Sequence, residues 1–207
     1  MQKTQLVWLG HSFFKIISSS GKIILIDPWK QFPPGNALFP DGYAINDADL
    51  ILVTHGHFDH LMGNGFVEKT WGLKSEIHKE DNYLVEQAST QSLLFGMSIP
   101  KPPLPGSFFE DGDILTFGNS SLKVIFVPGH SPGGVAFYSE PDQLLIAGDI
   151  LFCGSVGRTD LPKGNHDLLI TGILDKLMVL DPAVKVYSGH GPETTIGAEK
   201  QFNQFLN

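Results

Sequence analysis

The chain has 207 residues, a length that fits one domain. Apolar residues make up 42 % of the chain and charged residues 17 %, which favours a packed core and excludes disorder as the main state. With 14 basic and 22 acidic residues the net charge is −8 and there is no basic run, which argues against a nucleic-acid partner.

The first half of the chain alternates short apolar runs with turn residues. Runs rich in β-branched or aromatic residues predict strands, and the charge and spacing of two longer stretches predict helices. We expect strands at 5–9, 13–17, 22–26, 50–53 and around Ile77, helices at 62–72 and 80–95, and a long loop at 28–47.

The second half repeats the order of strands followed by a helix. We expect strands at 114–117, 122–127, 135–138, 144–147 and 184–187, and helices at 166–180 and 194–206. This repeated order predicts an α/β protein built as a four-layer α/β/β/α sandwich, with a single domain over residues 1–207.

A dense group of potential metal ligands follows the strand at 50–53. The segment from Thr54 to His60 reads THGHFDH and holds three histidines and one aspartate. Imidazole nitrogens and carboxylate oxygens bind borderline metals, and three histidines this close would repel one another when protonated. A metal site therefore explains the segment better than a solvated histidine-rich loop.

Three further strands run into a glycine and then a residue that can bind metal. A glycine at these places lets the backbone turn, so that the next side chain points back over the strand ends. The candidate ligands are His55, His57, Asp59, His60, His130, Asp149 and His190. Because one ion takes about four ligands, seven predict two divalent ions that share a bridging carboxylate and generate a hydroxide from water.

This arrangement resembles the metallo-β-lactamase fold superfamily of hydrolases. The resemblance implies that one ion is bound by His55, His57 and His130, the other by Asp59, His60 and His190, and that Asp149 bridges them. It also implies zinc, with iron or manganese as alternatives, and a catalytic role for Asp59 in orienting the hydroxide. With aspartate at position 149 the chain resembles glyoxalase II-like members, whereas true β-lactamases have a cysteine at the matching position.

The two parts of the chain resemble different branches of this superfamily. Residues 63–206 are similar to short type II glyoxalase-like (hydroxyacylglutathione hydrolase-like) proteins in the stretches VPGHSPG, AGDILF, GSVGRTD and SGHGPETT. Residues 1–60, with WLGHS, ILIDPW and DLILVTH, instead resemble the ascorbate-phosphate-lactonase-like branch. We therefore expect a natural or engineered junction of two branches near 54–65. About 17 residues follow His190, so the helical domain with which full-length glyoxalase II contacts glutathione is not expected.

Four residues outside the ligand set have two interpretations each. The resemblance of residues 1–60 to the lactonase-like branch implies that His11, in its Gly-His-Ser turn, contacts the substrate or a carboxylate near the metals. The other interpretation is a hydrogen-bonded turn histidine. Arg158 binds a substrate carboxylate as a bidentate fork or forms a structural salt bridge. Cys153 lines the pocket, as a small buried thiol rather than as a nucleophile. Asp27 anchors a turn at its strand end or supports a ligand from behind.

The function predicted from these residues is hydrolysis of a thioester such as S-lactoylglutathione to a hydroxy acid and a thiol. A lactonase or phosphodiesterase would share the metals, and a mononuclear iron persulfide dioxygenase would use fewer ligands. A weakly active or non-catalytic metal-binding scaffold is the remaining alternative. The expected partner is a small-molecule substrate, and the sequence leaves the oligomeric state open.

The location of the protein is predicted from what its sequence lacks. The single cysteine excludes an internal disulfide, and no apolar run reaches the ~18 residues that cross a membrane. The N-terminus has no secretory segment. We therefore expect a cytoplasmic protein with neither a membrane nor a nucleic acid as partner.

Overall fold

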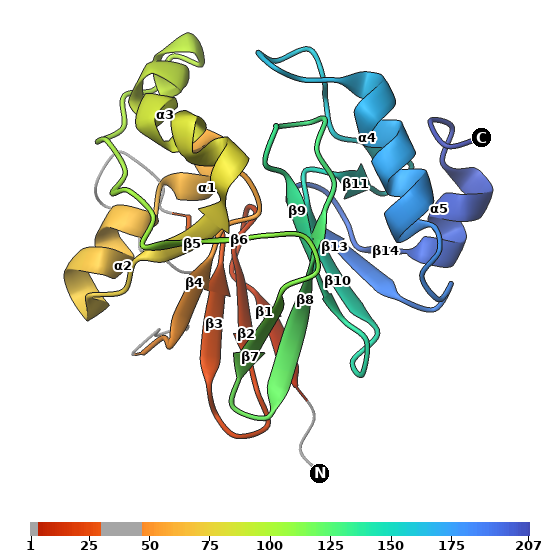
Figure 1. The fold of residues 1–207 in the computed structure, drawn as a ribbon, viewed down its shortest axis with the longest axis horizontal. Helices are drawn as coiled ribbons and strands as arrows, with labels where there is room; N and C mark the ends of the chain where they lie inside the picture. The colour runs from red at the N-terminus through yellow and green to blue at the C-terminus, as the bar shows by residue number, and fades with distance from the viewer. Residues whose placement is uncertain (1–3, 30–46) are drawn as a thin grey trace. The chain divides into compact units, whose positions relative to one another are not determined.

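The computed structural model describes residues 4–29 and 47–207, so most of the loop expected at 28–47 lies outside the described residues. The chain forms two compact units, Met1–Phe108 with Thr116–Ser120, and Phe109–Leu115 with Ser121–Asn207. Each unit is organised around one six-stranded mixed sheet (Figure 1). The single domain over residues 1–207 stays a prediction.

The sheet of the first unit brings four strand ends to one edge. Its strands, in spatial order, are β1 (Gln5–Trp8), β2 (Phe14–Ile17), β3 (Ile23–Ile26), β4 (Leu50–Leu52), β5 (Ser75–His78) and β6 (Ser107–Phe109). The strands β1, β2 and β3 pair antiparallel, whereas β4 lies parallel to both β3 and β5. The carboxyl ends of β1, β3, β4 and β5 therefore meet at the same edge.

Short helices cover one face of this sheet. They are α1 (Phe58–Leu61), α2 (Asn64–Trp71), the 3-10 turn η1 (Lys79–Asp81) and α3 (Asn82–Leu94). Val67 of α2 packs with Leu25 and Ile51 of the sheet, and α1 and α3 pack in a second cluster over Val53 and Ile77. The helix predicted at 62–72 is thus preceded by a separate turn of helix, which carries part of the histidine-rich segment.

The sheet of the second unit has the order β14-β13-β10-β9-β8-β7. Its strands are β7 (Ile114–Phe117), β8 (Ser120–Phe126), β9 (Val135–Ser139), β10 (Leu144–Gly148), β13 (Lys185–Ser188) and β14 (Thr194–Thr195), and β11 (Leu151–Phe152) with β12 (Ser155–Val156) forms a separate hairpin. The pairing of β10 is parallel with β13 and antiparallel with β9, which is itself antiparallel to β8. The carboxyl ends of β8, β10 and β13 therefore share one edge.

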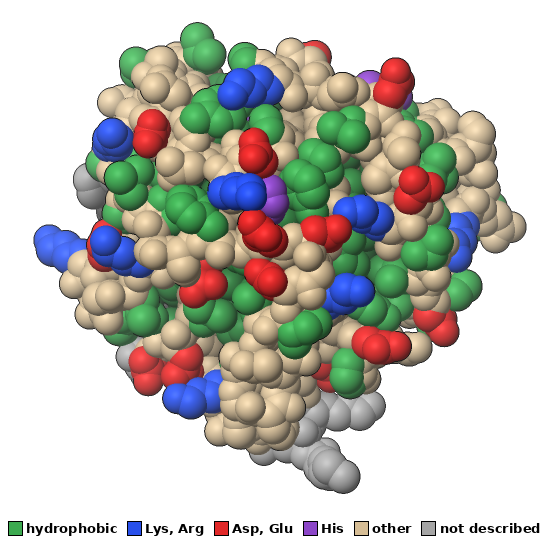
Figure 2. All heavy atoms as spheres, viewed as in Figure 1, with side chains coloured by type: hydrophobic (Ala, Val, Ile, Leu, Met, Phe, Trp, Pro, Cys, Tyr) green, Lys and Arg blue, Asp and Glu red, His purple; other side chains and the backbone are tan. Residues whose placement is uncertain are grey.

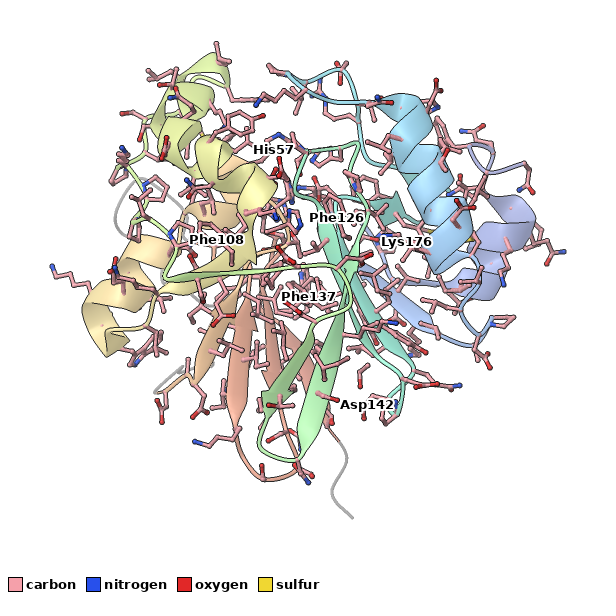
Figure 3. The ribbon with its side chains drawn as sticks, in the orientation of Figure 1. His57, Phe108, Phe126, Phe137, Asp142 and Lys176 are labelled. Carbon is pink, nitrogen blue, oxygen red and sulfur yellow. The ribbon has the colours of Figure 1, made fainter. Side chains whose placement is uncertain are left out.

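The helices of the second unit pack on one face of its sheet. They are α4 (His166–Gly172), which continues as the π-helical turn η2 (Ile173–Leu177), and α5 (Ile196–Phe202). Leu169, Ile173 and Leu177 recur on one side of α4 and η2 and join the apolar core. Lys176 points to β8, where it donates to the carbonyl of Phe126 at 2.8 Å (Figure 3).

The strands predicted from apolar runs are confirmed, with ends shifted by a residue or two. The prediction missed β6, β11, β12 and β14, which have two or three residues each. The last predicted helix begins only at Ile196, because Thr194 and Thr195 pair with β13 instead. Among the described residues, no helix combines the length and apolarity that a bilayer crossing requires.

Candidate metal centre

The candidate site residues of the first unit follow the ends of strands β1, β3 and β4, which are aligned with one another across the sheet. Register pairs run from Trp8 to Phe14, then to Ile26 and Leu52, across β1 to β4. Ligands often bind at the carboxyl ends of parallel strands, because loops there can present several side chains to one point. The first sheet thus places His11, Asp27 and the histidine-rich segment at the same edge.

The histidine-rich segment is compact and mostly buried. His55 lies in the loop after β4, His57 directly precedes α1 (Figure 3), and Asp59 and His60 lie on α1. The ring of His55 is 4.8 Å from that of His57 and 4.0 Å from that of His60, between centroids. Four of the seven predicted ligands are therefore together within this unit.

One buried carboxylate sets the orientation of two of these histidines. Oδ2 of Asp27 accepts hydrogen bonds from the Thr54 hydroxyl at 2.6 Å and from Nδ1 of His60 at 2.8 Å. Because the Thr54 hydroxyl gives its hydrogen to Asp27, it accepts from Nδ1 of His55, 3.1 Å away. Both histidines then carry hydrogen on Nδ1 and present the Nε2 lone pair, as a metal ligand must.

A second buried carboxylate, Asp81, holds the backbone of the segment and was missed by the sequence analysis. Asp81 is fully buried before α3, and its Oδ2 accepts from the Gly56 amide at 2.7 Å. A Cβ at Gly56 would lie 2.7 Å from Cβ of Leu84 and 2.8 Å from the Asp81 carbonyl oxygen. Gly56 is therefore needed for close packing rather than for a left-handed backbone, and no local spacing in the sequence indicates this.

The second unit assembles the other three predicted ligands. His130 follows β8, Asp149 follows β10 and His190 follows β13, at the shared edge of the sheet. Nε2 of His130 is 3.7 Å and Nε2 of His190 is 3.5 Å from Oδ2 of Asp149. Gly129 and Gly148 have positive φ angles, as the turns predicted before these ligands require. At the end of β13 the positive φ angle belongs instead to Gly191, after His190, and not to Gly189, which precedes it.

The donor atoms of this second set fit a metal ion. Nδ1 of His130 donates to the carbonyl oxygen of Arg158 at 2.8 Å, so the Nε2 lone pair faces the Asp149 carboxylate. Two ligand atoms bound to one tetrahedral ion lie about 3.4 Å apart, given metal–ligand distances of roughly 2.1 Å. The separations around Asp149 are close to this value, and the donors are the nitrogen and oxygen types that zinc, iron and manganese accept.

Two of the three predicted substrate contacts, Arg158 and Cys153, have exposed side chains. The guanidinium of Arg158 donates two hydrogen bonds of 2.7 Å to the Asp160 carboxylate. The part of Arg158 that contacts a candidate ligand is its backbone carbonyl, which accepts from His130. Cys153 is an exposed free thiol in the turn between β11 and β12, so the expectation of a buried thiol is wrong. A direct contact of either residue with substrate stays a prediction.

We expect Arg158→Met to raise the pKa of the Asp160 carboxyl group. The hydrogen bonds from Arg158 hold that pKa at about 2, so loss of the cation returns it toward the ordinary range near 4. Carbon-13 NMR titration of the side-chain carboxyl groups measures the shift. Metal content should not change, because His130 contacts the Arg158 backbone; an unaltered Asp160 titration would contradict the interpretation of the pair.

Comparison with known proteins places the chain in a family. The profile of the "Metallo-beta-lactamase superfamily" matches residues 16–190. The chain is 41 % identical to "Probable metallo-hydrolase YqgX" of Bacillus subtilis, over 76 % of this chain and 75 % of that one. It is 35 % identical to "Hydroxyacylglutathione hydrolase GloC" of Haemophilus influenzae, over 76 % of each chain.

Solved structures agree with the family assignment. The crystal structure of "BLEG-1 B3 metallo-beta-lactamase" aligns with a TM-score of 0.83 and 30 % identity, over 98 % of this chain and 99 % of that one. The structure of "TTHA1623 in a di-iron-bound form" aligns with a TM-score of 0.77 and 37 % identity, over 98 % and 94 %. Single proteins thus align with almost the whole chain, and the expected junction of two branches finds no support. The predicted fold is confirmed, and the chain belongs to the metallo-beta-lactamase superfamily of metal-dependent hydrolases.

Proposed function

We propose that this protein hydrolyses thioesters in the manner of glyoxalase II, with S-lactoylglutathione as the representative substrate. The observation that carries the proposal is the donor set, which consists of imidazole and carboxylate groups with Asp149 after β10 and no thiolate. The name of the relative from Haemophilus influenzae, a hydroxyacylglutathione hydrolase, supports the same class of substrate.

The proposed centre joins the two ligand sets and holds two divalent ions. His55, His57 and His130 would hold one ion and Asp59, His60 and His190 the other, with Asp149 between them. Zinc is the first choice, and iron is the leading alternative because a relative was crystallised in a di-iron-bound form. Such ions, when bound, lower the pKa of a water from ~15.7 toward ~7 and polarise a carbonyl group.

The protein's own residues orient the reactants. The oxygen of water adds to the thioester carbonyl carbon, the C–S bond breaks, and the proton of the water leaves with the thiolate as a thiol. We assign to Asp59 the orientation of the attacking water, since its carboxylate is partly exposed and can accept the water's hydrogen. Asp27, through its contacts with His60 and Thr54, leaves Nε2 of His60 and of His55 available as the atoms that would hold the ions.

The substrate is proposed to be a small molecule rather than a nucleic acid or a membrane. The net charge is −8, and on the face drawn in Figure 2 the Lys and Arg side chains are interspersed with Asp and Glu side chains. A nucleic-acid surface would instead need clustered cations to neutralise phosphates. The cytoplasmic location stays a prediction.

Metal analysis and a substrate panel on the same preparation test the proposal. We expect two equivalents of zinc or iron per chain, and faster hydrolysis of S-lactoylglutathione than of a lactone, a β-lactam or bis-p-nitrophenyl phosphate. An Asp149→Ala preparation made in parallel controls for contaminating hydrolases. Preferred cleavage of any other substrate would overturn the thioesterase assignment, and one iron with oxygen uptake on a persulfide would favour a dioxygenase. Bound metal without turnover on the whole panel would favour a scaffold.

A further inference from the structure

His11 occupies a turn that is held in an unfavourable backbone conformation. It lies between β1 and β2 with a φ angle of 49°, a region that residues with a side chain rarely adopt. Its carbonyl accepts a hydrogen bond of 2.7 Å from the indole of Trp8, and its ring stacks on Trp29 with centroids 5.0 Å apart. The hydrogen bond from Trp8 therefore holds the backbone of the turn, and the stack on Trp29 holds the His11 imidazole.

The fixed imidazole meets the carboxylate of a predicted ligand. Nε2 of His11 lies 3.2 Å from Oδ2 of Asp59, the same oxygen that lies 3.7 Å from Nε2 of His60. The side chains of His11 and Asp59 are both about a quarter exposed, whereas His60 is fully buried. Asp59 thus stands at the open side of the ligand set, where an aspartate has more freedom to rotate than the histidines behind it.

We propose that His11 is a positioning residue for Asp59. Its Nε2–H donates to Oδ2 and fixes the rotamer of the carboxylate, so that Asp59 and His60 would together hold one ion. The role rests on the proposed metal centre, but not on any particular substrate. The strained turn fits the role: a glycine would relieve the backbone and would lose the imidazole, so the histidine serves something other than the turn.

The test separates positioning from stability with two substitutions at this site. His11→Gly removes the imidazole and relieves the positive φ, and His11→Gln retains an N–H donor at a reach similar to Nε2. Gln143, in the turn between β9 and β10, has the same φ angle of 49°. Gln143→Gly therefore serves as the matched control for strain relief at a distance from the ligands.

We expect His11→Gly to release metal about 10- to 100-fold more readily in a chelator titration, with kcat lowered by a similar factor and KM little changed. The melting temperature of its metal-free form should stay within about 4 °C of that of Gln143→Gly, since relief of strain offsets the lost stacking. His11→Gln should recover most of the metal retention.

Three outcomes would overturn the role of His11. The first is unchanged metal retention in His11→Gly, and the second is a large drop in the melting temperature of its metal-free form. The third is a failure of His11→Gln to recover metal retention, which would make the imidazole itself a ligand. A wild-type protein that holds two ions but cleaves nothing on the panel would overturn the thioesterase proposal alone. The chelator comparison would then still decide the role of His11.

Discussion

Replacing Asp27 with asparagine is expected to remove most of the bound metal and to lower turnover by about 10²- to 10⁴-fold, while the protein remains folded. The carboxylate accepts from the Thr54 amide, the Thr54 hydroxyl and Nδ1 of His60. An amide has only one oxygen, so its NH₂ group must replace one of the two acceptors. A similar Asp-to-Asn change behind a catalytic histidine costs about 10⁴-fold in serine proteases, through the wrong tautomer.

The position of the new NH₂ group decides which ligands are lost. At the site of Oδ2 it would donate to His60 and to the Thr54 hydroxyl, which would then turn its hydrogen toward His55. Both histidines would be driven to carry hydrogen on Nε2, the atom that must bind the ion. At the site of Oδ1 the NH₂ group would instead face the Thr54 amide, donor against donor, which costs about 1–3 kcal/mol.

The backbone conformation at position 27 contributes little to the expected loss of metal in Asp27→Asn. Asp27 has a φ angle of 49°, and asparagine tolerates that region as well as aspartate does. Asp49→Asn is the control, because Asp49 also accepts from one backbone amide, that of Ile23, and from a side chain, the Lys22 ammonium, but lies outside the ligand set. Elemental analysis, kcat and urea unfolding should distinguish the two variants. Equal metal content in both would show that Asp27 does not control the ligands.

The sequence predicts secondary structure well where a segment shows its own pattern of apolar residues. The three strands at the start and the core strands β8 to β10 stand out because their apolar residues cover several positions in a row. The strand β14 does not, since Thr194 and Thr195 are a strand only through their pairing with Val186 and Lys185. Similarly, α1 has four residues, too few to show a helical period.

The same distinction applies to the candidate site. The candidate ligands could be identified because they are chemically distinctive and follow strand ends, and parallel strands bring such ends together; their binding of metal stays a prediction. The supports could not, because each acts over a long sequence separation. The Asp81 carboxylate accepts from Gly56, 25 residues away, and the support of His130 is a backbone carbonyl, which any residue at position 158 could supply. Only Asp27 carried a local signal, an aspartate between an apolar strand and a proline.

Gly157→Ala is expected to disable the second ligand set without changing any ligand. Gly157 is buried, and its amide donates to the Ile150 carbonyl at 3.1 Å. A Cβ there would collide with the Asp149 carbonyl oxygen and would lie 3.1 Å from Cβ of His130. Since one neighbour is backbone, no side-chain rotation relieves the clash. The added methyl group must therefore move Asp149 away from its place or push His130 from its own.

The expected cost of Gly157→Ala is about 1–3 kcal/mol in the free energy of unfolding, as for other overpacked sites. Metal binding should suffer more, because ligand atoms displaced by a few tenths of an ångström no longer meet one ion at about 2.1 Å. Gly65→Ala in α2 is the control: its Cβ would meet Pro103 at an ordinary 3.7 Å, and alanine favours the helix by up to about 1 kcal/mol. Elemental analysis and urea unfolding of both variants measure the difference. If Gly157→Ala kept two ions per chain, close packing between Asp149 and His130 would not be what sets their geometry.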